Sequence, residues 1–395
     1  MTDQDFSLSE PAVLAVARDK PGVEELYEAG LGDRLQRLLL HLDQNLGLDA
    51  YGRRMAHETV VDILERRARL FADRERYPDL TKEEIRQPLI VTGQARSGTT
   101  LLHSLIAADP NSQSPAWWDS MRPSPPPGIS PADDPRIEQM NQEMAELVRL
   151  QPNLLQSHPY FDQGAHALME CEKLCMLDFR YVFRSTFYRV PAYVSMSLDA
   201  DPVEFYQFHR MVLQALQWRR PSRRWALKGT EHHANLPALK TVYPDAIVIW
   251  IHRDPLKVVP SVLEMLASLS EGVSGKPADR PAFGRQVLRR YQTTLETAMA
   301  SPMIDHPDVY HMRYIDFAAN PVGSVEAVYR RYGLPFPADT GAAMQAWCDA
   351  PQNQGDRYGK FQYSLAAFDL TPADIEASMA PYRARFDIPY EGQRP

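Results

Sequence analysis

The sequence predicts an α/β fold, in which helices flank a mainly parallel central sheet and a helical N-terminal region packs on it. Two observations support this prediction. Apolar runs without polar alternation, PLIV and AIVIWI, are typical of strands buried on both faces of a parallel sheet. Segments with apolar residues at helical spacing follow such runs, and this alternation indicates a sheet that is covered on both sides.

The composition bounds the class of protein. The chain has 395 residues, 44% apolar and 24% charged, which is ordinary for a soluble globular protein. The net charge of −8 disfavours a nucleic-acid partner, so an anionic ligand needs a local cluster of cations. Three cysteines fit a reducing compartment, and Cys171 and Cys175 are expected to be buried thiols. Because neither a secretory signal nor an apolar stretch of about 20 residues is found, we expect a cytoplasmic protein without a membrane span.

Residues 1–87 are predicted to form a helical region packed on a domain at 88–395. The segments LGDRLQRLLLHLDQNLGL and MAHETVVDILERRARLFADRERY carry apolar residues three and four apart. Thr81 and Glu84 have the spacing of a capping box, which predicts a short helix before the first strand.

The first half of the domain is predicted to run strand, loop, helix. PLIVTG is the strand, and SGTTLLHSLIAADP is a helix that opens directly from the loop. Residues 115–135 are rich in proline, which neither continues a helix nor donates to a strand ladder, so we expect a long loop. Such a loop is a candidate lid, with a plain surface connection as the alternative. Residues 136–200 are expected to be mostly helical.

The second half is predicted to continue this alternation. Asp201 and Pro202 have the pattern of a helix start. The expected strands lie in PSRRWALKG, DAIVIWIHRDP and VYHMRYIDF. The expected helices lie in NLPALKTVY, DPLKVVPSVLEML, NPVGSVEAVYRRYGLPF and TPADIEASMAPYRARFDIP.

The stretch GQARSGTT has the form of a phosphate-binding loop, with Gly93, four residues, and then Gly98, Thr99 and Thr100. Glycines let the backbone approach an anion, and amide N–H groups at the helix start donate to it. Nucleoside triphosphatases carry a lysine where this chain has Thr99, so triphosphate hydrolysis is disfavoured. Arg96 instead supplies a cation inside the loop. The alternative is a glycine-containing turn without a ligand.

A second anion site is predicted in HRDPLKVVPS. Arg253 follows a buried strand, at the edge of a parallel sheet where ligands usually bind, and Ser261 lies about two helical turns later. A guanidinium and a hydroxyl so placed suit one phosphate. The alternative for Arg253 is an ion pair with Asp254 or another carboxylate. Together, the two motifs suit a nucleotide with phosphates at both ends.

These paired motifs resemble those of sulfotransferases that use 3′-phosphoadenosine 5′-phosphosulfate (PAPS). The segments RRWALKGTEHHANLPALKTVYPDA, RYIDFAANP and YSLAAFDLTPADIEASMAPYRARF also look like a bacterial branch of this family, so the resemblance covers nearly the whole chain. It implies a P-loop-like fold, PAPS as co-substrate and no metal. Two departures are Ala95, where proline is usual, and Arg96, where the cytosolic branch has lysine and the protein-tyrosine branch arginine.

The resemblance also implies roles for individual residues. Arg96 would stabilise charge on the leaving phosphate, Lys228 would contact the sulfuryl oxygens, and His232 would be the base, with His233 and Glu231 left open. Tyr314 would meet the adenine and Lys360 would complete the 3′-phosphate pocket. The implied nucleotide-binding residues are Gly93, Arg96, Ser97, Gly98, Thr99, Thr100, Arg253, Ser261, Tyr314 and Lys360.

The acceptor is expected to be a small molecule with a hydroxyl or phenol group, with an amine less favoured. Trp117 and Trp118 would line a pocket for a lipophilic acceptor, or else belong to the core. The sequence leaves a homo-oligomer open. Two alternatives remain for the function, a P-loop kinase or other phosphotransferase and a non-catalytic nucleotide-binding protein of the same fold.

Overall fold

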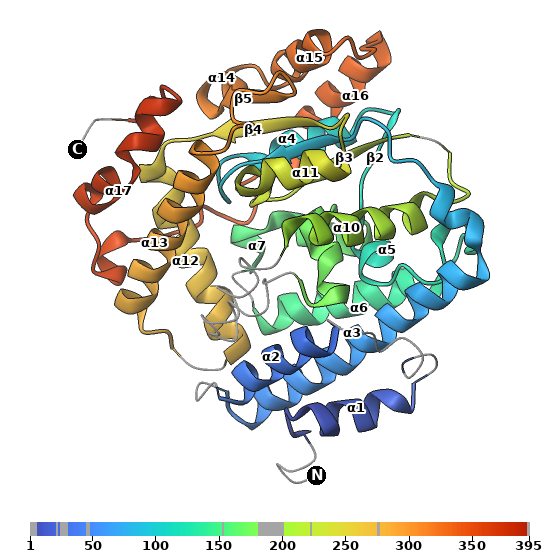
Figure 1. Cartoon of the computed structure of the whole chain (residues 1–395). Helices are drawn as coiled ribbons and strands as arrows, with labels where there is room; N and C mark the ends of the chain where they lie inside the picture. The colour runs from blue at the N-terminus through green and yellow to red at the C-terminus, as the bar shows by residue number, and fades with distance from the viewer. Residues whose placement is uncertain are drawn as a thin grey trace.

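The computed structural model describes residues 6–20, 23, 31–44, 48–151, 154–180, 201–221, 223–274 and 277–392. In this part of the chain a sheet of five parallel strands has the order β2-β3-β1-β4-β5 (Figure 1). The strands are β1 (Leu89–Thr92), β2 (Ser112–Gln113), β3 (Arg224–Lys228), β4 (Ile247–His252) and β5 (Val309–Arg313). The predicted α/β class with a parallel sheet is confirmed.

The order of the strands decides which loops meet. In the register of the sheet, Val91 of β1 lies opposite Lys228 of β3 and Ile249 of β4. The carboxyl ends of these three strands therefore share one edge of the sheet, where parallel folds bind their ligands. The loop after β1, the end of β3 and the turn after β4 all open at this edge.

Helices cover both faces of the sheet, which explains the strands without polar alternation. Leu89 and Val91 pack on one face with α4 (Thr99–Ala107) and α15 (Pro321–Arg331). Ile90 points to the other face. There it packs with α10 (Pro202–Gln217) and α11 (Leu236–Val242), which Figure 1 shows on the opposite side of the sheet from α15.

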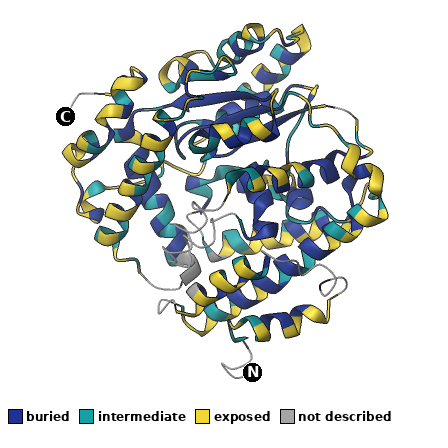
Figure 2. Ribbon diagram, in the orientation of Figure 1, coloured by how far each residue is buried: buried dark blue, intermediate teal, exposed yellow. Residues whose placement is uncertain are grey.

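A third cluster lies beside β4. Trp250 packs with apolar residues of α12 (Pro255–Ser274), α13 (Arg280–Met299) and α17 (Pro372–Arg385). Figure 2 shows these helices with buried inner and exposed outer faces, while strands β1 and β4 are buried along their whole length. The burial pattern is that of a parallel sheet enclosed by amphipathic helices.

The N-terminal region is helical, as predicted. Its helices are α1 (Glu10–Arg18), α2 (Leu31–Asp43) and α3 (Ala50–Arg76), which share an apolar cluster. The same cluster includes Phe179, from a segment far along the chain. Arg34 and Arg67 also donate to Asp178 Oδ1, at 2.8 and 2.9 Å, so apolar and ionic contacts tie these helices to the rest of the fold.

Before α10, the described residues between the second and third strands form helices of 3 to 16 residues. They are α5 (Trp117–Met121), η3 (Pro127–Ile129), α6 (Pro135–Leu150), α7 (Leu154–Ser157), η4 (Pro159–His166) and η5 (Cys171–Asp178). The prediction of an irregular loop at 115–135 is therefore wrong for α5 and η3. The prediction of helix over 136–200 holds for much of 136–178, and residues 181–200 lie outside the described residues. Cys171 and Cys175 are buried free thiols, as predicted.

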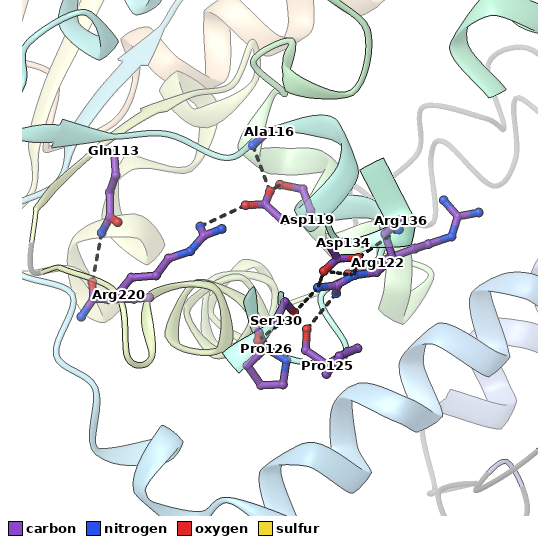
Figure 3. A network of polar contacts seen from close by, with 12 residues as sticks. Gln113, Ala116, Asp119, Arg122, Pro125, Pro126, Ser130, Asp134, Arg136 and Arg220 are labelled. Atoms are coloured by element: carbon purple, nitrogen blue, oxygen red, sulfur yellow. Dashed lines mark hydrogen bonds and ion pairs between the residues drawn. The ribbon is translucent and has the colours of Figure 1, made fainter. Parts of the chain in front are cut away.

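An arginine ties the proline-rich segment 115–135 to the helix that follows it. Arg136, in α6, makes an ion pair with Asp134, whose side chain also accepts from the first turn of the helix. The Arg136 guanidinium donates at 2.6, 2.8 and 2.7 Å to oxygen atoms of Arg122, Pro125 and Ser130 (Figure 3). A single buried cation thus satisfies two backbone carbonyls of the proline-rich segment.

Other local predictions met mixed outcomes. The Asp201 side chain caps α10 by accepting from Val203 N, and Thr371 forms a capping box with Asp374 at the start of α17. Thr81 caps no helix start, because it lies inside the 3-10 turn η2 (Pro78–Lys82) and donates to Pro78 O.

The expected strand over VYHMRYIDF ends at Arg313, and α14 (Tyr314–Ala319) begins at the next residue. The sequence analysis missed α13, α16 (Ala338–Asp349) and the short turns η6 (His232–Asn235), η7 (Pro351–Asn353) and η8 (Leu365–Phe368).

Candidate active site

The loop between β1 and α4 has the backbone of an anion cradle. Gly93 and Gly98 adopt φ angles of +143° and +98°, and Gly98 is the N-cap of α4. A Cβ atom at Gly98 would lie 2.7 Å from the Tyr314 ring, so only glycine fits there. The Ser97 hydroxyl is buried without a hydrogen-bond partner in the described structure. An unpartnered buried donor beside a helix N-terminus fits a bound phosphate or sulfate group.

Arg96 joins the two predicted anion motifs. Its Nε donates to Ser261 Oγ at 3.1 Å, and its Nη1 donates to the carbonyl oxygen of Ser157 at 2.7 Å. Burial lowers the pKa of Arg96, and the nearby charge of Arg253 lowers it further. Among the ion pairs of the described residues, none joins Arg96 to a carboxylate. A half-buried cation whose hydrogen bonds go to neutral atoms is stabilised by an incoming anion.

Arg253 lies next to the same loop. Its Nη1 donates to the carbonyl oxygen of Arg96 at 3.0 Å, and its guanidinium stacks 4.0 Å from the centre of the Tyr314 ring. A bidentate ion pair joins it to Glu391, with distances of 2.9 and 3.0 Å. The structure therefore brings together the loop, Ser261, Arg253 and Tyr314, which the sequence separates widely.

Lys360 is not part of this group in the described structure. It lies on an exposed coil, and its backbone carbonyl accepts from the Gln362 side chain at 3.2 Å. The neighbouring Phe361 lies closer to the site, since the Arg96 guanidinium is 5.8 Å from its ring centre. The expected 3′-phosphate contact by Lys360 has no support in this geometry.

Lys228 ends β3 beside the start of α4. Its Nζ donates to Thr100 Oγ1 at 3.2 Å and lies 2.8 Å from Glu170 Oε1. Glu170 also pairs with Lys173 at 3.5 Å. Burial alone would raise the pKa of Glu170, but Lys228 and Lys173 outweigh it and hold that pKa well below its usual range. Glu170 is thus an ionised carboxylate near the anion loop.

His232 lies in the core rather than beside the loop. Its Nδ1 is 2.9 Å from the Tyr206 hydroxyl and its Nε2 is 3.2 Å from Cys171 Sγ, and only 1% of the residue is exposed. Burial, with His209 and His233 nearby, lowers the pKa of His232 well below its usual value. Both ring nitrogens are engaged, so this geometry disfavours His232 as the base that the sequence analysis favoured.

The two alternatives to His232 differ in this respect. The His233 ring stacks 4.9 Å from Trp250 and its Nδ1 is 3.3 Å from Thr92 Oγ1, while its Nε2 is buried without a hydrogen-bond partner among the described residues. Glu231 makes an ion pair with Arg290. The carboxylate that the structure places near Lys228 is Glu170, which the sequence analysis missed. No local motif marks Glu170, because only the fold brings it to the end of β3.

Aromatic residues lie around Glu170 and Arg96. The Trp117 ring is 4.8 Å from Lys173 Nζ and 5.4 Å from the Phe161 ring, which stacks on Tyr160. Trp118 is buried in an apolar cluster on which Trp117 also packs, and Arg136 and Arg220 approach the Trp118 ring. The two tryptophans therefore differ: Trp117 lies near the charged site, and Trp118 belongs to the core.

The fold and this site define a protein of the sulfotransferase class. A family model described as the sulfotransferase family matches residues 88–338, more than half of the chain. The chain belongs to the sulfotransferase family, and the predicted resemblance is confirmed.

Two curated relatives carry a specific name. The omega-hydroxy-beta-dihydromenaquinone-9 sulfotransferases Stf3 of Mycobacterium bovis and Mycobacterium tuberculosis are each 24% identical to this chain over 256 residues. The match covers 62% of this chain and 63% of each relative, so it spans less than two thirds of their length.

Two solved structures share the fold over almost the whole chain. Sulfotransferase STF9 from Mycobacterium avium superposes with a TM-score of 0.85 at 25% identity, covering 98% of both chains. Sulfotransferase STF1 from Mycobacterium tuberculosis H37Rv gives a TM-score of 0.79 at 24% identity, covering 95% of this chain and 100% of that one. The helical N-terminal region is therefore part of the shared fold.

Among the described residues, no helix combines the length and hydropathy that crossing a bilayer requires.

Proposed function

We propose that this chain transfers the sulfuryl group of PAPS to a hydroxyl group of a lipophilic small molecule. The observation that carries the proposal is Arg96, a half-buried cation in the loop after β1 whose hydrogen bonds go to Ser261 Oγ and Ser157 O. In a member of the sulfotransferase family, such a cation suits the phosphosulfate group of the donor.

The adjacency of the two anion motifs supports a doubly phosphorylated nucleotide. The loop from Gly93 to Thr100 would hold the 5′-phosphosulfate, and Arg253 with Ser261 would hold the 3′-phosphate. The contacts of Arg96 with Ser261 and of Arg253 with the Arg96 carbonyl keep the two sites side by side. We keep Tyr314 in the proposed nucleotide site, because it packs against both Gly98 and Arg253.

We propose Glu170 as the general base in place of His232. In sulfuryl transfer a bond forms from the acceptor oxygen to sulfur, the bond from sulfur to the phosphate oxygen breaks, and the acceptor proton passes to the base. Glu170 is ionised and lies 2.8 Å from Lys228 Nζ. Lys228 would contact the sulfuryl oxygens and Arg96 the leaving phosphate. An anion bound to Lys228 offsets the positive charge of that lysine beside Glu170. The pKa of the Glu170 carboxylate then rises, which makes it a stronger base.

A lipophilic acceptor is supported by the aromatic residues near Glu170. Trp117, Phe161 and Tyr160 form a cluster of neighbouring rings, of which the Trp117 ring lies 4.8 Å from Lys173 Nζ. Such rings suit the apolar part of a substrate whose hydroxyl reaches a carboxylate. The name of the relative Stf3 describes a sulfotransferase of a hydroxylated menaquinone, which is an acceptor of this class. We also propose a cytoplasmic location, in line with the sparse cysteines.

The test is transfer of labelled sulfate from PAPS to a lipid extract, with identification of the labelled product. We expect a sulfate ester of a lipophilic alcohol or phenol, together with binding of adenosine 3′,5′-bisphosphate in calorimetry. No labelled product and no affinity for that nucleotide would overturn the proposal. Phosphate transfer from ATP that EDTA abolishes would favour a phosphotransferase instead.

A further inference from the structure

The C-terminal part of the chain places a carboxylate on Arg253. Glu391 Oε1 accepts from Arg253 Nε at 2.9 Å, and Oε2 accepts from Nη2 at 3.0 Å. This is the paired geometry in which a guanidinium also binds a phosphate. Because Arg253 Nη1 donates to the Arg96 carbonyl, the edge that faces Glu391 is the one that can give two parallel bonds.

Several bonds hold Glu391 in this position. Its backbone N–H donates to Asp254 Oδ2 at 2.7 Å, and Asp254 Oδ1 accepts from Arg383 of α17 at 2.7 Å. The Tyr390 hydroxyl donates to Glu376 Oε2, also at 2.7 Å. The pair of Glu391 with Arg253 is therefore held by the folded chain, unlike a solvated pair between two free side chains.

A 3′-phosphate and the Glu391 carboxylate compete for the same cation. Both are oxyanions that need two N–H donors, and the carboxylate cancels the charge that would attract the phosphate. A phosphate next to a paired Arg253 would also be repelled by the Glu391 charge. The two ligands therefore exclude each other at this edge.

We infer that Glu391 is an internal competitor of the 3′-phosphate, in an inference that rests on the proposed nucleotide site. Glu391 occupies Arg253 in the free protein and leaves when a nucleotide with a 3′-phosphate binds. Each such binding event carries the cost of breaking the pair. A nucleotide without a 3′-phosphate does not compete with Glu391, so the carboxylate acts selectively on one class of ligand.

The experiment compares the wild-type protein with Glu391→Gln, a change that keeps the shape and removes the charge. Calorimetry measures binding of adenosine 3′,5′-bisphosphate and of adenosine 5′-monophosphate. We expect the bisphosphate to bind about tenfold more tightly to the variant, within the usual range for coupled sites, and the monophosphate to bind equally to both proteins. A chain that ends at Ile388 should behave like Glu391→Gln. The matched control is Glu326→Gln, which breaks a surface pair with Arg330 on α15 and should change neither affinity.

The outcomes separate this inference from the proposed function. If the bisphosphate binds Glu391→Gln with equal or lower affinity than the wild type, Glu391 is at most a positioning residue for Arg253 and the inference is overturned. If neither protein binds the bisphosphate, the proposed nucleotide site fails and the inference fails with it. Binding by the variant alone would support both.

Discussion

Arg96 is the residue whose loss should be most damaging to turnover. Arg96→Ala removes the cation proposed to face the leaving phosphate, together with its bonds to Ser261 and Ser157. We expect kcat to fall about 10²–10³-fold, as for other lost donors that stabilise a transition state. Steady-state assays with PAPS measure this change. Arg96→Lys keeps a charge without the planar fork and should recover part of the rate. Full activity in Arg96→Ala would contradict the role.

The carboxylate of Glu170 should matter more for chemistry than the ring of His232. Glu170→Gln keeps the size of the side chain and removes the base, so kcat should fall about 10²–10⁴-fold while the nucleotide still binds. His232→Asn disturbs the contacts with Tyr206 and Cys171, so it should lower stability more than the rate of the folded protein. The measurements are single-turnover rates and nucleotide affinity. If Glu170→Gln is fully active while His232→Asn binds the nucleotide but is inactive, the general base is His232 and not Glu170.

Glu172 predicts a specific pH dependence of stability. Burial, with Glu231 and Glu170 nearby, raises the pKa of Glu172 to about 8 from 4.5. Between these pH values the folded protein retains a proton that the unfolded chain releases, so this group makes stability fall as pH rises from about 4.5 to about 8. The slope is at most about 1.4 kcal/mol per pH unit.

Glu172→Gln tests this sign directly. The backbone N–H groups of Thr230 and Glu231 donate to separate oxygens of Glu172, so the amide of the variant keeps one of these two bonds, and it does not titrate. Urea unfolding of both proteins across this pH range should show a shallower decline for the variant. Identical slopes would mean that Glu172 is ionised in the folded protein.

At the scale of elements, the junction of β1, loop and α4 depends on Gly98. Gly98→Ala places a Cβ 2.7 Å from the Tyr314 ring at a φ of +98°. Gly333→Ala is the matched control, because Gly333 also has a positive φ, +63°, but has nothing within 4 Å of the added carbon. The control should cost about 1 kcal/mol of unfolding free energy from backbone strain alone.

Gly98→Ala should cost more stability than the control and should also weaken binding of adenosine 3′,5′-bisphosphate. Thermal unfolding and calorimetry measure the two effects. If Gly98→Ala binds the nucleotide as tightly as Gly333→Ala does, the loop does not cradle it.

The elements differ in how far sequence could predict them. β1 and β4 were predictable because a strand buried on both faces leaves an unbroken apolar run. The end of β5 before Tyr314 could not be predicted, because RYIDF has the residue types of a strand. In the structure α14 begins at Tyr314, whose ring packs on Gly98. In α16 the buried residues are few, Thr340 and Met344, so its helical period is weak.

The residues of the site also differ in how far sequence could predict them. The loop at Gly93 and the pair Arg253 and Ser261 carry local patterns, and both motifs reach one edge of the sheet. Glu170 carries no local pattern, because its role depends on Lys228, which arrives from another strand. His232 was favoured because it follows Lys228 in the sequence, but the fold turns its ring into the core.

At the scale of the whole molecule, Asp178 links the N-terminal helices to the rest of the fold. It accepts from Arg34, Arg67 and Arg180, and only 2% of Arg67 is exposed. Asp178→Asn removes the carboxylate that these three arginines share and should cost about 3–5 kcal/mol of unfolding free energy.

Chemical unfolding monitored by two probes measures the effect of Asp178→Asn. The control is Glu58→Gln, which breaks an exposed pair with Arg54 and should cost about 0.5 kcal/mol or less. If Asp178→Asn is as mild as this control, the helical region does not depend on the ionic cluster.

The strand order has a consequence for how the chain is made. β1 pairs on both sides with strands that follow much later, since Leu89 lies opposite Ala226 and Ile247. At ordinary translation rates, on the order of ten seconds pass between the synthesis of β1 and that of β3, the first of its two neighbours. During that interval its two open edges are exposed to self-association, so a nascent chain of this type should depend on chaperones until β4 has been synthesised.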